Sequence, residues 1–248
     1  VYDPRTLTTL YSDNAALIIR DYLLSADGLN LDAAQVSDPS FAAFADVCDQ
    51  VVVTNAGSEP RYRLWLSYSL EDDPKSVLAR MLAACDAELH QTPDGLVAVR
   101  GGEYTVPTVV IDTDLGHVRG CTMHRGTDQL QRYNTLKLNY TDPDLGHTVQ
   151  EGESWVDAGL LAAVGGRVES SDIDLAACPS HSQARRIAKI LIARDNPEWI
   201  GEVHCTLAAL DALSERYITL RIPELLIGGP FRVDEMEISG EGVKLSVS

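Results

Sequence analysis

The stretch DPKSVLARMLAACDAELHQTPDGLVAVRGG, residues 73–102, decides how the first part of the chain folds. Asp73 followed by Pro74 predicts a helix start, because the carboxylate caps free backbone N–H groups and proline fits the first helical turn. Apolar residues then recur every three or four positions and predict one buried helix face, made of Val77, Leu78, Met81, Leu82, Cys85 and Leu89. The turn signal Pro93-Asp94-Gly95 and the apolar run 96–99 predict a strand after this helix.

Two further helices and a strand are predicted before this stretch. Ser12 or Asp13 would cap the first helix, and Asp38-Pro39 would open the second in the same way as Asp73-Pro74. Apolar and polar residues alternate over 62–70, which predicts a strand. Residues 1–102 therefore read as an α+β domain.

Gly101-Gly102 is the predicted domain boundary, and strand patterns dominate after it. Apolar or alternating runs predict strands at 106–111, 135–140, 199–207, 218–222 and 231–233, and a closing hairpin around Gly240-Glu241-Gly242. One helix interrupts them, with Ser180 or Ser182 as its cap and Asn196-Pro197 as its stop. Residues 162–171 are expected to form a flexible loop. Residues 103–248 are thus predicted to be a β-rich domain with one inserted helix.

The charge balance excludes some classes of function. The chain has 248 residues, with 37 acidic side chains against 20 basic ones and a formal net charge of -17. Such a surface repels phosphate backbones and anionic lipid, so tight binding to nucleic acid or to a membrane surface is not expected. No apolar run is long enough for a membrane-spanning segment, and neither a starting Met nor a signal peptide opens the chain. We therefore expect a part of a longer polypeptide.

The five cysteines, an odd number without a CxxC pair, are predicted to be buried free thiols: Cys48, Cys85, Cys121, Cys178 and Cys205. Nucleotide-binding and standard catalytic motifs do not occur in the sequence. His117 and His124, with Cys121 between them, could be metal ligands, but exposed histidines explain them better. The stretches Asp112–Gly116 and Asp142–Gly146 could hold calcium, but β-turns select the same residue types.

Two pairs of carboxylates and one basic cluster were also considered. Glu151 with Glu153, and Asp172 with Asp174, could serve a glycosidase, but both pairs lie in polar sequence rather than in an apolar pocket. Arg185, Arg186 and Lys189 fall on the polar side of their predicted helix, as a solvated face or an ion-pair site. The sequence therefore predicts no catalytic, cofactor-binding or metal-binding residues, no cofactor, and a protein that is not an enzyme.

Several motifs in the first half resemble those of phage tail tip attachment proteins, the family of proteins similar to protein J of phage lambda. These are YDPR (2–5), YSDNAAL (11–17), RDYL (20–23), FADVCD (44–49) and VRGGEY (99–104). The second half continues the resemblance in the same order with YNTL (133–136), YTDP (140–143), ARRIAKIL (184–191), GPFRV (229–233) and GVKL (242–245). The chain departs from the family at 213–216, where LSER replaces a glycine-aspartate turn and leaves the barrel connection there open.

This resemblance implies an assembly role. Proteins of this family are homotrimeric hubs with small barrel-like domains at the tail tip or baseplate of a long-tailed bacteriophage, assembled in the host cytoplasm. The resemblance implies that the chain closes the distal tail tube and contacts distal tail and tube proteins, the tape-measure protein and receptor-binding fibres. It also implies that DNA passes through the channel without specific binding during ejection, and we expect acidic side chains to line that channel.

Two other functions stay open at this point. A carbohydrate-binding β module would show aromatic side chains gathered on one sheet face. A tail-associated cell-wall hydrolase would need convergent acids or a histidine metal site.

Overall fold

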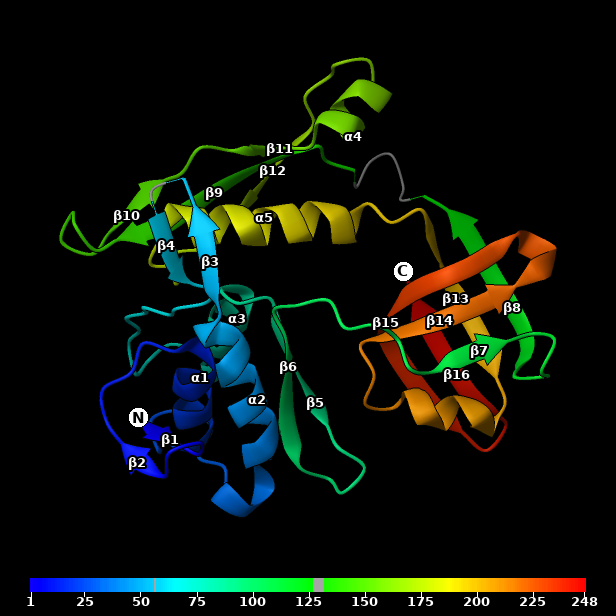
Figure 1. The fold of residues 1–248 in the computed structure, drawn as a ribbon, viewed down its shortest axis with the longest axis horizontal. Helices are drawn as coiled ribbons and strands as arrows, with labels where there is room; N and C mark the ends of the chain where they lie inside the picture. Colours follow the sequence, from blue (N-terminus) through cyan, green and yellow to red (C-terminus); the bar gives the residue numbers. More distant parts are fainter. Residues whose placement is uncertain (56, 127–131) are drawn as a thin grey trace. The chain divides into compact units, whose positions relative to one another are not determined.

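The computed structural model describes residues 1–55, 57–126 and 132–248, and their contacts divide the chain into two units (Figure 1). Unit 1 consists of Val1–Glu103 and Tyr133–Ile192, and unit 2 of Tyr104–Arg132 and Ala193–Ser248. The sequence analysis placed residues 133–192 in the second domain, whereas their contacts place them in unit 1. The physical reason is that Leu136, Leu138 and Ile187 are buried in the same core as the N-terminal helices.

Helices of unit 1 begin where the sequence places capping groups. They are α1 (Ala15–Leu24), α2 (Asp38–Asp49), α3 (Pro74–Ala83), α4 (Ala158–Ala163) and α5 (His181–Asp195), whose last residues pass into unit 2. Asp73 caps α3 by accepting the Ser76 N–H, and the Ser180 hydroxyl accepts the Gln183 N–H at the start of α5. The cap of α1 is Asn14 instead of Ser12 or Asp13, and its side-chain oxygen accepts N–H groups from Ala16 and Leu17. Figure 1 shows α1 and α2 side by side, in agreement with their contacts.

Strands of unit 1 form three hairpins and one larger sheet. The hairpins pair β1 (Tyr2–Asp3) with β2 (Thr8–Thr9), β3 (Val51–Thr54) with β4 (Gly57–Pro60), and β5 (Ala87–Gln91) with β6 (Val97–Gly101). In the larger sheet, β9 (Thr135–Asp142) pairs antiparallel with β10 (Thr148–Glu151) and β11 (Trp155–Val156), and parallel with β12 (Ser170–Ile173). The expected flexible loop at 162–171 thus contains the end of α4 and the start of β12.

Two predictions for unit 1 are wrong in detail. The helix predicted through Leu89 ends at Ala83, because Asp86 adopts a positive φ of 48° and Leu89 lies on β5, paired with β6. Residues 62–70 do not form a strand: only Arg63 makes a single bridge, to Asn14. Tyr62 and Leu64 are nevertheless buried, which explains the alternating pattern without a sheet.

A buried glutamine holds this irregular segment in place. The side chain of Gln183 on α5, which is 2% exposed, accepts the Arg63 N–H at 2.9 Å and donates to the Arg63 carbonyl at 2.8 Å. It also donates to the Ala84 carbonyl at 2.8 Å. One side chain therefore supplies the hydrogen bonds that a neighbouring strand would otherwise supply, which a buried backbone segment requires.

Unit 2 is built on a curled half-barrel sheet of six strands in the order β7-β14-β15-β16-β13-β8. The strands are β7 (Val110–Asp112), β8 (Val118–Arg125), β13 (Trp199–Cys205), β14 (Tyr217–Ile222), β15 (Ile227–Ser239) and β16 (Gly242–Val247). Neighbouring strands pair antiparallel except β7 and β14, which are parallel. The fold class is therefore α+β with a barrel-like part, as predicted, although β7 is shorter than the strand expected at 106–111.

Alternation along the strands forms the core of unit 2. Ile218, Leu220 and Ile222 point inward from β14 and are 0%, 0% and 3% exposed, whereas Arg221 is exposed. The 3-10 helix Leu207–Ala212 covers part of this core with Ala209 and Ala212 and precedes the departure at 213–216. No helix among the described residues is long and apolar enough to cross a membrane.

Candidate functional site

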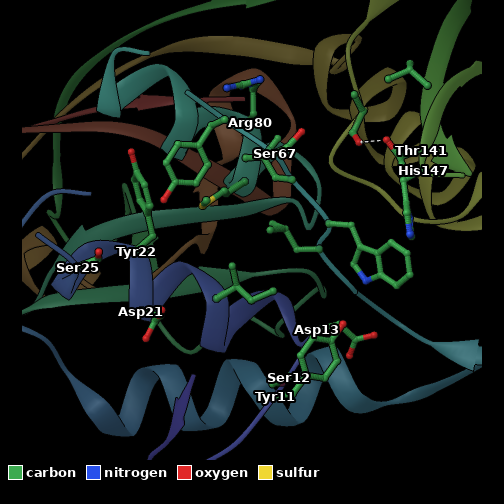
Figure 2. A pocket seen from close by; sticks show the side chains of 18 residues that line it. Tyr11, Ser12, Asp13, Asp21, Tyr22, Ser25, Ser67, Arg80, Thr141 and His147 are labelled. Carbon is green, nitrogen blue, oxygen red and sulfur yellow. Dashed lines mark hydrogen bonds between the residues drawn. The ribbon is translucent and has the colours of Figure 1, made fainter. Parts of the chain in front are cut away.

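A pocket of about 610 Å³ lies in unit 1, between α1, the irregular segment 64–68, α3 and the β9–β10 hairpin (Figure 2). This volume falls in the range of small-molecule and peptide sites. The N-terminal segment contributes Tyr11, Ser12 and Asp13, and α1 contributes Asp21 and Tyr22. The pocket thus exists only because four segments distant in sequence meet there.

Aromatic side chains are concentrated in this pocket. Tyr11, Tyr22, Trp65 and Tyr68 line it, although the whole chain has only 15 aromatic residues, three Trp, nine Tyr and three Phe. The rings of Tyr22 and Tyr68 meet edge to face with centroids 5.5 Å apart, and the His147 ring lies 4.9 Å from that of Trp65. Tyr11 is 88% exposed and leaves an apolar ring face open to a ligand.

The charged groups at the pocket are mostly engaged in ion pairs. Asp13 pairs with Arg63 at 3.0 Å, and Arg80 pairs with Asp72 at 3.3 Å. The Tyr22 hydroxyl donates to the Pro74 carbonyl, and burial raises the pKa of this phenol above its usual value. Among the described lining residues we find no nucleophile hydrogen-bonded to a base and no pair of facing carboxylates, so the arrangement suits binding rather than bond cleavage.

Ion pairs around Arg5 fix the chain that leads into the pocket. Arg5 contacts Asp3, Asp46 and Asp49, each at 2.9 Å, and thereby ties the N-terminal segment to α2. The hydrogen bond from Arg5 lowers the pKa of Asp3. At Asp49, burial acts to raise the pKa, but hydrogen bonds from Arg63 and Arg5 outweigh it and the pKa is lowered.

The candidate metal ligands do not converge. Cys121 packs against the core of unit 2, whereas His124, three residues further along the same strand, is exposed. His117 accepts the Asp112 N–H through Nδ1 at 3.4 Å, within its own turn. No group of three or more His, Cys, Asp or Glu residues in the described part of the chain is placed to hold a metal ion.

The two aspartate-rich stretches are turns of the same construction. Asp112 accepts the Asp114 N–H at 2.9 Å, and Asp142 accepts the Asp144 N–H at the same distance. Gly116 and Gly146 complete the turns with φ values of 71° and 72°, in the left-handed region that favours glycine. The prediction of plain turns is confirmed.

The paired carboxylates and the basic cluster stabilise the fold locally. Glu153 forms an ion pair with Arg185, and Asp172 lies 3.9 Å from Lys137. Arg186 bonds Glu59 and the Arg61 carbonyl, each at 2.6 Å. The basic side chains on α5 thus form an ion-pair site, one of the two interpretations given above.

All five cysteines are free, as predicted. Cys48, Cys85, Cys178 and Cys205 are buried, and Cys121 is partly exposed. Burial raises the pKa of Cys48 and Cys178 to about 12 and that of Cys205 to about 11. These thiols stay protonated near neutral pH and are poor nucleophiles.

The sequence analysis did not find the pocket. Its aromatic residues belong to a helix, an irregular segment and the N-terminal stretch, so no local spacing indicates that they meet. Asn14 next to Arg63 in one bridge is the contact that brings two of these segments together, and it is a long-range one. A sequence signal exists only in the composition, since aromatic residues are scarce in the chain.

Comparison with known proteins identifies the class. The model of a family described as "Putative phage tail protein" matches residues 73–198, slightly more than half of the chain. The chain belongs to this family of phage tail proteins. A search of curated proteins finds no match.

Solved structures share the fold. One is a chain from the virion of a native gene transfer agent particle, with TM-score 0.53, 14% identity, and coverage of 70% of this chain and 38% of that chain. Another is the 43 kDa tail protein of prophage MuSo2 from Shewanella oneidensis, with TM-score 0.50 and 14% identity, and coverage of 96% of this chain and 63% of that chain. This chain therefore spans less than two thirds of either protein.

Proposed function

We propose that this chain is part of a hub subunit at the tail tip or baseplate of a long-tailed bacteriophage. Three copies close the distal end of the tail tube and join it to distal tail proteins, tube proteins, the tape-measure protein and receptor-binding fibres. The subunit assembles in the host cytoplasm and is a virion component without enzymatic turnover. The family match over residues 73–198 is the observation that carries this proposal.

The fold and its chemistry support an assembly role. A half-barrel sheet leaves strand edges available to neighbouring subunits, which suits a protein whose work is to form contacts. The carboxylates considered for a hydrolase lie in local ion pairs, and buried thiols that stay protonated are compatible with a reducing cytoplasm.

The net charge supports a further part of the proposal. A surface with formal charge of -17 repels DNA, so acidic side chains that line the channel would let the genome leave without adhering. DNA is thus a passing molecule in this proposal and not a bound partner.

Electron cryo-microscopy of purified phage particles tests the proposal. We expect density for this chain in three copies around the distal end of the tube, with acidic residues toward the lumen. One peripheral copy, or a lumen lined by basic residues, would contradict the hub and the channel, respectively.

A further inference from the structure

Two strand edges of unit 2 lack a neighbouring strand. In the four-stranded part of the sheet with the order β15-β16-β13-β8, residues 233–239 of β15 pair with β16, and β8 pairs with β13. The outer side of 234–239 and the outer side of β8 have no strand partner among the described residues. Unpaired N–H and C=O groups along such edges are templates for another strand.

The two edges carry opposite charges. The β15 edge has Asp234, Glu235 and Glu237 and no basic residue. The β8 edge has Arg119 and Arg125, with His124 between them, and no acidic residue. Opposite charges across neighbouring strands stabilise their pairing, and like charges oppose it.

Strand directions permit the two edges to join. Each step from β15 to β16, to β13 and to β8 is antiparallel, so β8 runs opposite to β15. A second copy that continues the sheet would therefore place its β15 antiparallel to β8. The regular ladder positions of β8, 120–125, match the length of 234–239.

There is also room beside β8. A groove of about 500 Å³ is lined by Val118–Met123 on one side and by Thr113, Ile222, Glu224 and Leu225 on the other. A side chain placed at Gly120 would meet no atom within 4 Å. Cys121 and Met123 point to the core side of the sheet, and so does Met236 on β15.

We infer that the acidic edge 234–239 of one copy pairs with the basic β8 edge of the next copy, in an antiparallel and head-to-tail manner. This contact is heterologous, since it joins two different surfaces of identical chains, and such contacts close into rings when the rotation allows. Pairing of β8 with a second β8 is disfavoured because it would bring the two arginine-bearing edges together. The closure at three copies rests on the proposed hub function, whereas the edge pairing itself does not.

Native Cys121 allows a direct test. Since Met236 and Cys121 lie on the same face of their strands, Met236→Cys should form a disulfide with Cys121 of the next copy if the Cα atoms come within bonding reach, about 4.4–6.8 Å. Ile238→Cys, on the same face two residues on, covers the neighbouring register. Particles or assembled hubs are oxidised mildly and separated on a denaturing gel without reductant.

The expected result is a shift of the chain from the monomer band into dimer and trimer bands for at least one of these two variants. Glu237→Cys, on the opposite face, should remain monomeric, and Cys121→Ser should abolish the shift. Disulfide dimers of the parent chain, or no shift in any variant, would overturn the inference. A ring of three copies without these disulfides would refute the edge pairing alone, and disulfides in a chain absent from the tail tip would refute the hub alone.

Discussion

The two units of this chain bury their apolar residues in different ways. Unit 2 uses strand alternation, so Ile218, Leu220 and Ile222 enter the core from one strand and each is at most 3% exposed. Unit 1 buries an irregular segment and satisfies it with Gln183, a residue 120 positions away in sequence from Arg63. The comparison teaches that local pattern specifies one core, whereas long-range polar contacts complete the other.

The largest expected effect concerns the polar contact in unit 1. Gln183→Leu removes the partners of the Arg63 N–H and of the Arg63 and Ala84 carbonyls, and should lower the free energy of unfolding by about 4 kcal/mol. Chemical denaturation measures the loss, and Gln91→Leu on the exposed part of β5 is the matched control, with a change under about 0.5 kcal/mol. Equal effects of the two substitutions would refute the role of Gln183.

The corresponding test in unit 2 removes apolar volume. Leu220→Ala on β14 should cost about 3 kcal/mol, because Leu220 is fully buried and the cavity stays partly unfilled. Leu226→Ala, at a leucine that is 95% exposed, should have little effect. Hydrogen exchange should place the loss of protection from Leu220→Ala in unit 2, and equal loss throughout unit 1 would contradict separate cores.

Two glycines separate backbone strain from close packing. Gly102 has φ 74°, and a Cβ there would lie 2.7 Å from the Tyr62 ring, whereas Gly146 has φ 72° and open space. Gly146→Ala should cost about 1 kcal/mol through its left-handed conformation. Gly102→Ala should cost about 2 kcal/mol in total because it adds overpacking. Thermal denaturation of both variants measures the difference, and equal costs would mean that the contact with Tyr62 is easily relieved.

The smallest expected effect is electrostatic and belongs to unit 1. The folded-state pKa values of Asp3 and Asp49 are lowered, so their contribution is present above the unfolded pKa and is lost as pH falls through the folded values, between roughly pH 5 and 2. Solvent screens these groups, since the Asp49 side chain is 38% exposed, so we expect less than about 1 kcal/mol. Arg5→Gln should flatten this acid dependence in a denaturation series, and an unchanged slope would contradict the assignment.

Elements with a complete local signal were predictable from the sequence. The Asp-Pro starts give α2 and α3, and the two Asp-rich turns close as expected around Gly116 and Gly146. β12 was missed because a parallel strand next to β9 depends on a partner 35 positions away. The same cause hid the pocket, the return of residues 133–192 to unit 1, and the irregular course of 62–70, which an alternating pattern alone cannot distinguish from a strand.

The central claim, that this chain belongs to the hub of a phage tail, is tested most directly by imaging the tail tip of intact particles. An electron cryo-microscopy reconstruction should show three copies around the distal end of the tube. Their 234–239 edges should lie beside β8 of the neighbouring copies and acidic side chains should face the lumen. A reconstruction with this chain as one peripheral copy, or without it, would contradict the account.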